Sequence, residues 1–302
     1  GGTIENAVGS ANDDSIVGSV GVNNLQGGAG NDSIEGGAGA DVMDGGAGTD
    51  TASYANATAS VTVSLATGTG TVGHASGDTL ANFENLRGSI YADTLTGSTG
   101  INTIWGGIGS DIISGGAGDD ILNGEDGDDT IEGGAGADTM DGGLGSNTLS
   151  YANSSTGVTL SLATSTGTGG DAAGDTFTSF ANLTGSGQND SLTGDANGNF
   201  IQANAGDDTL DGGAGNDTLY GGTGNDIIMG GAGNDTNRGD AGTDTINYSL
   251  SGSGVTVNLT SGTGSGGDAQ GDTYNTIENI TGSASGDSLT GDGNVNMIDG
   301  GN

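Results

Sequence analysis

The chain has 302 residues, of which 69 are glycine, and it contains neither proline nor cysteine. Its 39 acidic side chains face only two basic ones, Arg87 and Arg238, which gives a formal net charge of −37. Self-repulsion on this scale opposes a compact state unless cations or a basic partner are bound. The negative charge also disfavours binding to nucleic acid and to anionic membrane surfaces.

A nine-residue repeat, G-G-x-G-x-D-x-U-x with U a large apolar residue, fills most of the chain. Unbroken runs cover 9–53, 88–150 and 185–247, and a fourth begins at 282. Of the 21 complete units, 19 have Ile, Leu or Met at position eight; the exceptions are Ala52 and Asn237. Position six is Asp in 16 units, and in the other five it is Asn23, Asn102, Asn147, Asn199 and Asn296.

Three spacers of equal length separate the runs, and each begins with a tyrosine. Each carries an alternating strand pattern, such as VTVSL at 61–65, followed by GDT and an apolar-x-N-apolar ending. The IENA at 4–7 corresponds to the end of a preceding spacer. We expect the leading tyrosines, Tyr54, Tyr151 and Tyr248, to pack over the ends of the runs. We expect the acids of the GDT motifs, Asp78, Asp175 and Asp272, to cap turns.

The pattern within each unit predicts strands and no helices. Positions one to six are rich in Gly, Asn and Asp and predict a turn, whereas positions seven to nine predict a short strand with position eight inward. The first run lacks two units relative to the second, which keeps every side chain on its face if a full coil takes two units. We therefore expect an all-β fold, an elongated right-handed parallel β-roll (a β-helix solenoid).

The position-six acids are the candidate functional residues. Carboxylates next to glycine turns that expose carbonyl groups form an all-oxygen ligand set, which suits Ca²⁺ better than Mg²⁺. One histidine and no cysteine exclude a repeated zinc or copper site. Acids that share a site should lie two units apart, and the Asn units should bind more weakly. The predicted metal ligands for many Ca²⁺ ions are Asp14, Asp32, Asp41, Asp50, Asp93, Asp111, Asp120, Asp129, Asp138, Asp190, Asp208, Asp217, Asp226, Asp235, Asp244 and Asp287.

These units resemble the calcium-binding nonapeptides of RTX (repeats-in-toxin) proteins. The resemblance implies a β-roll with calcium between successive turns, bacterial type I secretion in an unfolded state, and folding in external calcium. The opening TIENAVGSANDDSIVG at 3–18 is similar to the entry of the serralysin C-terminal β-roll. The spacers resemble those of long bacterial surface RTX proteins. The sequence begins without Met and ends partway through a repeat, so we expect a piece of a longer protein.

The expected organisation is one continuous solenoid; the alternative is a set of rolls separated by small β-caps. The segments are run 1 with the end of a preceding spacer (1–53), a spacer (54–87), run 2 (88–150), a spacer (151–184), run 3 (185–247), a spacer (248–281) and the start of run 4 (282–302).

Three functions compete on the sequence. The favoured one is a calcium-binding scaffold of a surface layer, adhesin stalk or extracellular filament, located outside the cell or on its surface. The alternative is a secretion and folding appendage of an exoenzyme, a serralysin-like protease or a lipase. A ligand-binding or ice-binding role has little support, because GTGND occurs once, at 222–226. No HExxH or G-x-S-x-G motif is present, so we expect no enzymatic activity.

The expected partners are calcium and further copies of the same chain in a lattice or filament, with neither nucleic acid binding nor membrane insertion. Asn237 breaks the apolar pattern of its unit. We expect a local weak point there, detectable by faster hydrogen exchange around 230–247 than around 208–229.

Overall fold

A computed structural model describes residues 5–301. It contains two compact units, one formed by 1–148 with 175–179 and the other by 149–174 with 180–302. The part of the predicted preceding spacer that falls on residues 1–4, and Asn302 at the end of run 4, lie outside the described residues.

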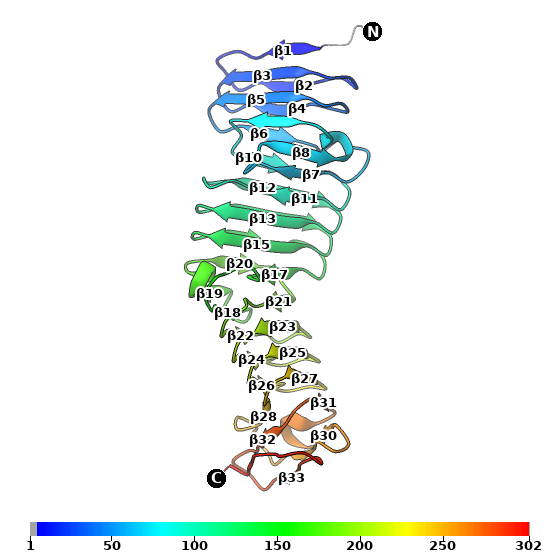
Figure 1. The fold of residues 1–302 in the computed structure, drawn as a ribbon, viewed down its shortest axis with the longest axis vertical. Helices are drawn as coiled ribbons and strands as arrows, with labels where there is room; N and C mark the ends of the chain where they lie inside the picture. Colours follow the sequence, from blue (N-terminus) through cyan, green and yellow to red (C-terminus); the bar gives the residue numbers. More distant parts are fainter. Residues whose placement is uncertain (1–4, 302) are drawn as a thin grey trace. The chain divides into compact units, whose positions relative to one another are not determined.

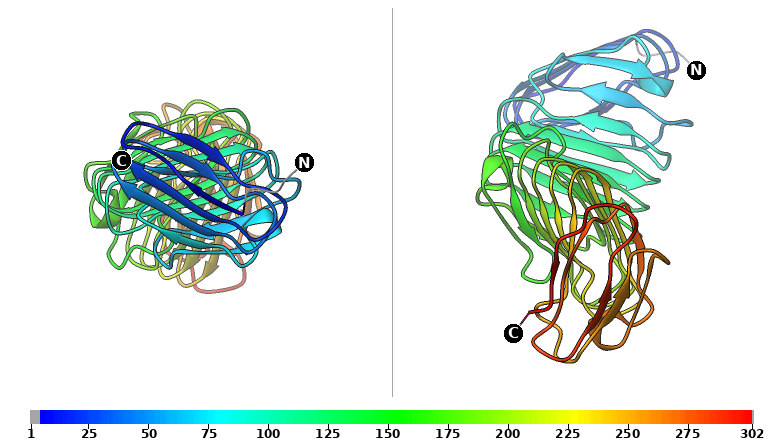
Figure 2. Two further views of the ribbon diagram at one scale, coloured as in Figure 1. Left: turned by 90° about the horizontal axis from the view of Figure 1, so that it is seen from above. Right: turned by 60° about the horizontal axis from the view of Figure 1, so that its bottom comes forward.

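Both compact units are parallel β-rolls in which each coil takes two of the sequence repeats. Leu25 pairs with Met43, Leu122 with Met140 and Ile201 with Leu219 in parallel register. The right-hand view of Figure 2 shows the successive coils of the first unit, coloured blue to green, with their strands side by side. The predicted all-β fold and the coil of two repeats are therefore confirmed.

In the first unit (Figure 1), two sheets face each other across the core. One sheet contains, in order of pairing, β1 (Asn6–Val8), β3 (Asn24–Ala29), β5 (Val42–Ala47), β9 (Thr79–Ala81), β8 (Thr69–Val72), β7 (Thr62–Ser64), β11 (Thr94–Thr96), β13 (Ile112–Ala117) and β15 (Thr130–Ala135). The other is parallel throughout and contains β2 (Ser15–Val17), β4 (Ser33–Glu35), β6 (Thr51–Ser53), β10 (Asn85–Arg87), β12 (Thr103–Ile108), β14 (Ile121–Asp126), β16 (Thr139–Asp141) and β20 (Thr176–Thr178). β17 (Thr148–Ser150) is the next strand after β16 along the chain.

The second unit repeats this plan. One sheet contains β21 (Asn182–Thr184), β23 (Phe200–Ala205), β25 (Thr218–Thr223), β27 (Thr236–Ala241), β31 (Thr273–Asn275), β30 (Thr263–Ser265), β29 (Thr256–Asn258) and β33 (Ser288–Thr290). The other contains β19 (Thr166–Thr168), β18 (Thr159–Ser161), β22 (Ser191–Thr193), β24 (Thr209–Asp211), β26 (Ile227–Met229), β28 (Thr245–Asn247), β32 (Asn279–Thr281) and β34 (Ile298–Asp299).

The spacers insert an antiparallel hairpin into an otherwise parallel sheet. In the spacer 54–87, β9 continues from β5, β8 runs antiparallel to β9 and β7, and β7 then pairs in parallel with β11. Strand β10 of the same spacer pairs with β6 and β12 in the opposite sheet. Each spacer also holds one 3-10 turn: η1 (Gly73–Ala75), η2 (Gly170–Ala172) and η3 (Gly267–Ala269). Within 5–301, no helix has the length and apolar character needed to cross a membrane.

Several strands are longer than the sequence predicts. β3 and β13, for example, run from position seven of one repeat through position three of the next, six residues rather than three. The extension occurs because neighbouring coils are in register, so that Gly28 and Ala29 pair with Gly46 and Ala47 even within the glycine-rich segment. The expectation that positions one to three belong to a turn is therefore wrong for these coils.

Within the runs, the position-eight side chains form the core, as predicted, and apolar spacer residues such as Val63 and Leu86 continue it. Ile16, Leu289 and Ile298 are more exposed, because their strands each pair with one neighbour only. The fully buried members, each at most 1 % exposed, are Leu25, Ile34, Met43, Ala52, Leu95, Ile104, Ile113, Leu122, Ile131, Met140, Leu149, Leu192, Ile201, Leu210, Leu219, Ile228 and Ile246.

Candidate metal centres along the repeat

The position-six side chains form ladders that run from coil to coil. Within a run, the main-chain N–H of a position-six residue donates a hydrogen bond to Oδ1 of the position-six residue in the next coil, as Asp111 does to Asp129 at 2.8 Å. The structure thus brings together the acid pairs that the two-repeat spacing predicts. The other links between two acids are Asp14 to Asp32, Asp32 to Asp50, Asp93 to Asp111, Asp120 to Asp138, Asp190 to Asp208, Asp208 to Asp226, Asp226 to Asp244 and Asp217 to Asp235.

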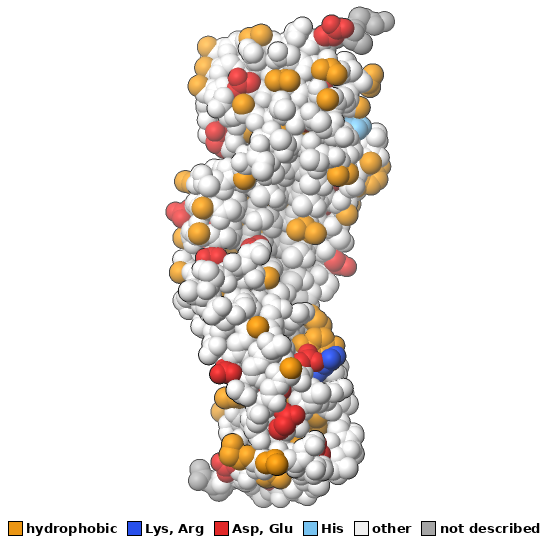
Figure 3. All heavy atoms as spheres, viewed as in Figure 1, with side chains coloured by type: hydrophobic (Ala, Val, Ile, Leu, Met, Phe, Trp, Pro, Cys, Tyr) orange, Lys and Arg blue, Asp and Glu red, His pale blue; other side chains and the backbone are white. Residues whose placement is uncertain are grey.

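The ladder acids are buried, and most keep one carboxylate oxygen without a partner. An unpaired buried carboxylate is costly, because it has lost its hydration without gaining an equivalent contact. On the face shown in Figure 3, acidic side chains appear only as scattered points, in keeping with this burial. The acids that are at most 2 % exposed and whose Oδ2 accepts no hydrogen bond are Asp32, Asp41, Asp50, Asp111, Asp120, Asp129, Asp208, Asp217, Asp226, Asp235 and Asp244.

No basic side chain compensates these buried charges. The sequence has only two arginines, and both lie at the surface beside other acids. Arg87 lies 3.7 Å from Glu125, and Arg238 pairs with Asp240. No arginine therefore neutralises the ladder, and its charge must be balanced by protons or by cations from solution.

Burial raises the pKa values of several ladder carboxyls. Desolvation is the largest cause for Asp111, Asp120 and Asp208, and the negative charges of neighbouring acids add to it, whereas the ladder hydrogen bond acts in the opposite direction. The pKa of each of these three reaches about 7. Without a counter-charge, these carboxyls are thus driven toward the protonated form near neutral pH.

The glycine at position one leaves space beside the ladder carboxylate. A Cβ on Gly106 would collide with Oδ2 of Asp111 and with the carbonyl oxygen of Gly124 in the next coil. The same holds for Gly212, with Oδ2 of Asp217 and the carbonyl of Gly230. Since no three acidic or histidine side chains of 5–301 gather in one place, carboxylates alone cannot complete a site. A carboxylate oxygen together with backbone carbonyls fits a hard cation such as Ca²⁺.

Four of the predicted ligands differ from the rest, because the protein already uses Oδ2 of each one; in Asp93, Asp190 and Asp287 it uses Oδ1 as well. In Asp93, Oδ1 accepts hydrogen bonds from Val61 N and Ser89 Oγ, and Oδ2 accepts one from Ser89 N at 2.5 Å. Asp14, Asp190 and Asp287 likewise accept at Oδ2 the main-chain N–H of Ser10, Ser186 and Ser283, respectively.

Where a run ends, an acid of the spacer accepts the ladder hydrogen bond in place of a position-six residue. The N–H groups of Asp41, Asp138 and Asp235 donate to Oδ1 of Asp78, Asp175 and Asp272, respectively, each 37 residues later. This offset is not a multiple of nine, so the repeat count alone does not find these acids. In the other ladder, Asp50 and Asp244 donate to Glu84 and Glu278.

The spacer tyrosines pack at the same ends of the runs, next to these spacer acids. Tyr54 is buried, and its hydroxyl donates to Oδ2 of Asp78 at 3.0 Å. Tyr248 does the same to Asp272 at 2.5 Å. Tyr151 is also fully buried. The expectation that these tyrosines pack at the ends of the runs is therefore confirmed.

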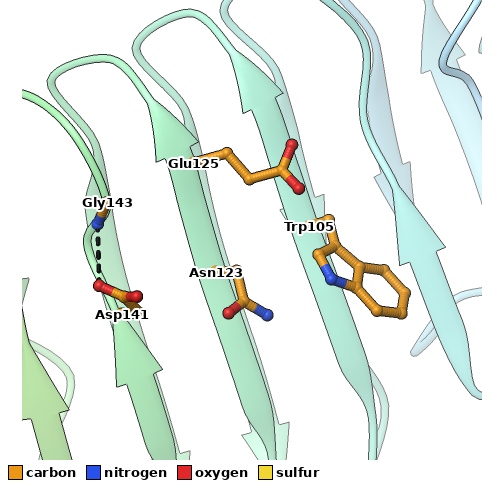
Figure 4. Close-up of a pocket in the computed structure, with 5 residues that line it drawn as sticks. All are labelled: Trp105, Asn123, Glu125, Asp141 and Gly143. Carbon is orange, nitrogen blue, oxygen red and sulfur yellow. Dashed lines mark hydrogen bonds between the residues drawn. The ribbon is translucent and has the colours of Figure 1, made fainter.

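A second candidate site is a shallow hollow on the outer face of the first unit (Figure 4). It is lined by Trp105, Asn123, Glu125, Asp141 and Gly143 from neighbouring strands. Trp105 is at an outward position, as the sequence predicts, and Asp141 accepts the N–H of Gly143. The carboxylates in this hollow face solvent and do not belong to the buried ladders.

The family model of the RTX calcium-binding nonapeptide repeat matches the chain at 17–52, 87–122, 114–149, 184–219 and 211–246. These matches cover most of the first three runs and together more than half of the sequence. No curated protein matches the chain.

Proposed function

We propose a function from the premise that this chain belongs to the RTX calcium-binding nonapeptide-repeat family, and so is a calcium-binding repeat module. The proposal is that the module is a structural scaffold of a secreted bacterial protein. It folds when it meets extracellular calcium, and it acts as a surface layer, adhesin stalk or filament segment.

The observation that carries the proposal is the ladder of buried carboxylates without an internal counter-charge. Asp111, Asp120 and Asp208 each hold an oxygen without a partner, so the folded state is unfavourable at neutral pH until cations are bound. When bound, calcium supplies the positive charge, and its binding free energy becomes folding free energy. The cell interior holds little free calcium, which makes folding after export the natural consequence of this design.

The residues proposed to hold calcium are the ladder acids with a carboxylate oxygen open toward the position-one glycine. The main-chain N–H of the position-six residue in the preceding coil, an Asp or an Asn, fixes the orientation of each carboxylate through Oδ1. The glycines leave room for carbonyl oxygens of the next coil to face the same space. The carboxylate and carbonyl oxygens of each coil are thus already in place for a cation, and no strand has to move for it to bind.

The scaffold role rests on the repeat itself. Coils that repeat in register build a regular surface, and bound cations remove the charge repulsion between chains. Sedimentation velocity at increasing protein concentration, in calcium-free buffer and then in millimolar calcium, tests both parts. The proposal predicts a slow, expanded chain without calcium and ordered polymers with it. A calcium-loaded chain that stays monomeric at every concentration would contradict the surface-layer and filament roles and would leave a stalk or an appendage.

The alternative is a folding appendage of an exoenzyme, favoured by the similarity of 3–18 to the serralysin β-roll entry. The sequence of the gene upstream of Gly1 distinguishes the two. An HExxH motif there would favour the appendage, and further runs and spacers would favour the scaffold.

A further inference from the structure

The first coil of every run differs in its hydrogen bonds from the coils that follow it. In the first repeat of each run, position two is Ser10, Ser89, Ser186 or Ser283 instead of glycine. The N–H of this serine donates to Oδ2 of the position-six Asp four residues later. In the following coils, the corresponding oxygen accepts no such bond, as in Asp111 and Asp208.

The backbone explains why the two kinds of coil diverge. In later coils, position two has a positive φ, +112° at Gly107 and +109° at Gly116. Glu125, Asn204 and Asp240 adopt positive φ at this position although they carry side chains, so the coil imposes the conformation. Among the described residues, none of the four position-two serines has a positive φ. Their main-chain N–H therefore points toward the carboxylate and occupies its Oδ2 with a hydrogen bond.

The second repeat of each first coil is closed in the same way by asparagine. Asn102 accepts the N–H of Ser98 at Oδ1 and donates from Nδ2 to the carbonyl of Glu84. Asn199 accepts the N–H of Asp195 and donates to the carbonyl of Ala181. A neutral amide satisfies both the main-chain N–H and the carbonyl group, because it offers an acceptor and a donor where a carboxylate offers only acceptors. Four of the five Asn repeats, at 23, 102, 199 and 296, lie in these first coils.

We propose that the first coil of every run is a closed coil, whose position-six side chains are satisfied by the protein and take no calcium. This inference rests on the proposed calcium binding and restricts it. The carboxylates of Asp14, Asp93, Asp190 and Asp287 are then structural, and calcium binding begins with the second coil. The closed coils and the tyrosine–aspartate contacts of the spacers together set where each calcium-binding segment begins and ends.

The test compares two aspartates in adjacent coils of the same ladder. Asp93→Asn and Asp111→Asn both remove one charge without changing size, and Asn already occupies the closed position at 102. Equilibrium dialysis of the full chain at saturating calcium, followed by elemental analysis, counts the bound ions. We expect Asp93→Asn to bind as many ions as the wild type and Asp111→Asn to bind at least one fewer.

A second pair, Asp190→Asn and Asp208→Asn, repeats the comparison in the other unit and covers the case that one variant does not fold. Loss of ions from Asp93→Asn or Asp190→Asn equal to that from its partner variant would overturn the closed coil while leaving calcium binding intact. Absence of calcium binding by the wild type would overturn the proposed function itself, and circular dichroism in calcium confirms that each variant has folded.

Discussion

The main-chain N–H of Asp111 donates to Oδ1 of Asp129 in the next coil, while Oδ2 of Asp129 accepts no hydrogen bond although the side chain is 1 % exposed. Oδ1 of this carboxylate therefore links two neighbouring coils, and Oδ2 is left for a ligand. Repetition of this arrangement in both units links the stability of the coils to the cations around them.

The first prediction concerns pH in the absence of calcium. The carboxyls of Asp111, Asp120 and Asp208 have folded-state pKa values of about 7, against about 3.9 in an unfolded chain. Between these values the folded chain binds more protons than the unfolded one, so the free energy of unfolding falls as pH rises through this window. Circular dichroism of calcium-stripped protein should show more β-structure at about pH 5 than at about pH 8.

Calcium reverses this dependence, because it must displace protons from the same carboxyls. Its affinity should fall as pH drops below about 7, in step with those pKa values. The account would be contradicted by calcium-free protein that is more ordered at the higher pH, or by a calcium affinity that does not change across the window.

The second prediction compares the effect of replacing a position-four glycine by alanine in a closed coil and in a later coil. Gly127 and Gly100 both occupy position four of their repeats. Gly127 has φ +149°, and an added Cβ would strike the carbonyl of Gly109, whereas at Gly100 the nearest atom is Ser98 Oγ at 3.8 Å and the φ is not positive. Gly127→Ala should destabilise the calcium-loaded fold by at least about 1–2 kcal/mol, and Gly100→Ala should change little. Urea unfolding in calcium measures both, and equal effects would refute the difference between the coils.

The third prediction concerns the tyrosine at the end of a run. Tyr54→Phe removes the hydroxyl that donates to Oδ2 of Asp78 and leaves that buried oxygen without its partner. The expected cost is about 1–3 kcal/mol in the free energy of unfolding. Tyr220→Phe is the control, since Tyr220 lies on an outer face of the second unit. A Tyr54→Phe variant as stable as the control would show that the contact does not stabilise the run.

The fourth prediction concerns Asn237, which is fully buried and has a hydrogen-bond partner for neither side-chain polar atom. Its neighbour in register is Leu219. Asn237→Leu should stabilise the second unit by about 1–3 kcal/mol, because it removes an unsatisfied amide and restores the apolar core. Thermal unfolding in calcium measures the change, and a lower melting temperature for the variant would contradict it. Faster hydrogen exchange around 230–247 than around 208–229 remains the matching prediction for the unchanged protein.

The coil and its core were predictable from the sequence, because both follow from local periodicity. A coil of two repeats places Leu25 beside Met43, and alternation within a strand turns both side chains inward. The buried ladder also follows from the spacing, since residues at the same position of successive coils must be neighbours.

What the sequence did not predict depends on hydrogen bonds between distant segments. The hairpin strand β8 contains TGTV and resembles a turn, and it becomes a strand only between β7 and β9. The closing of Asp93 depends on the direction of one N–H, that of Ser89. Serine in place of glycine at position two was the available signal for it, but its meaning depends on a backbone angle that the residue type alone does not fix.

The central claim is that the open carboxylate oxygens of the ladder hold calcium. Anomalous diffraction from crystals grown in calcium, collected at a long wavelength, locates each ion directly. The account predicts anomalous peaks beside Oδ2 of Asp111, Asp120 and Asp129 in the first unit and of Asp208, Asp217 and Asp226 in the second. Well-ordered carboxylates in such crystals without anomalous peaks beside them would contradict it.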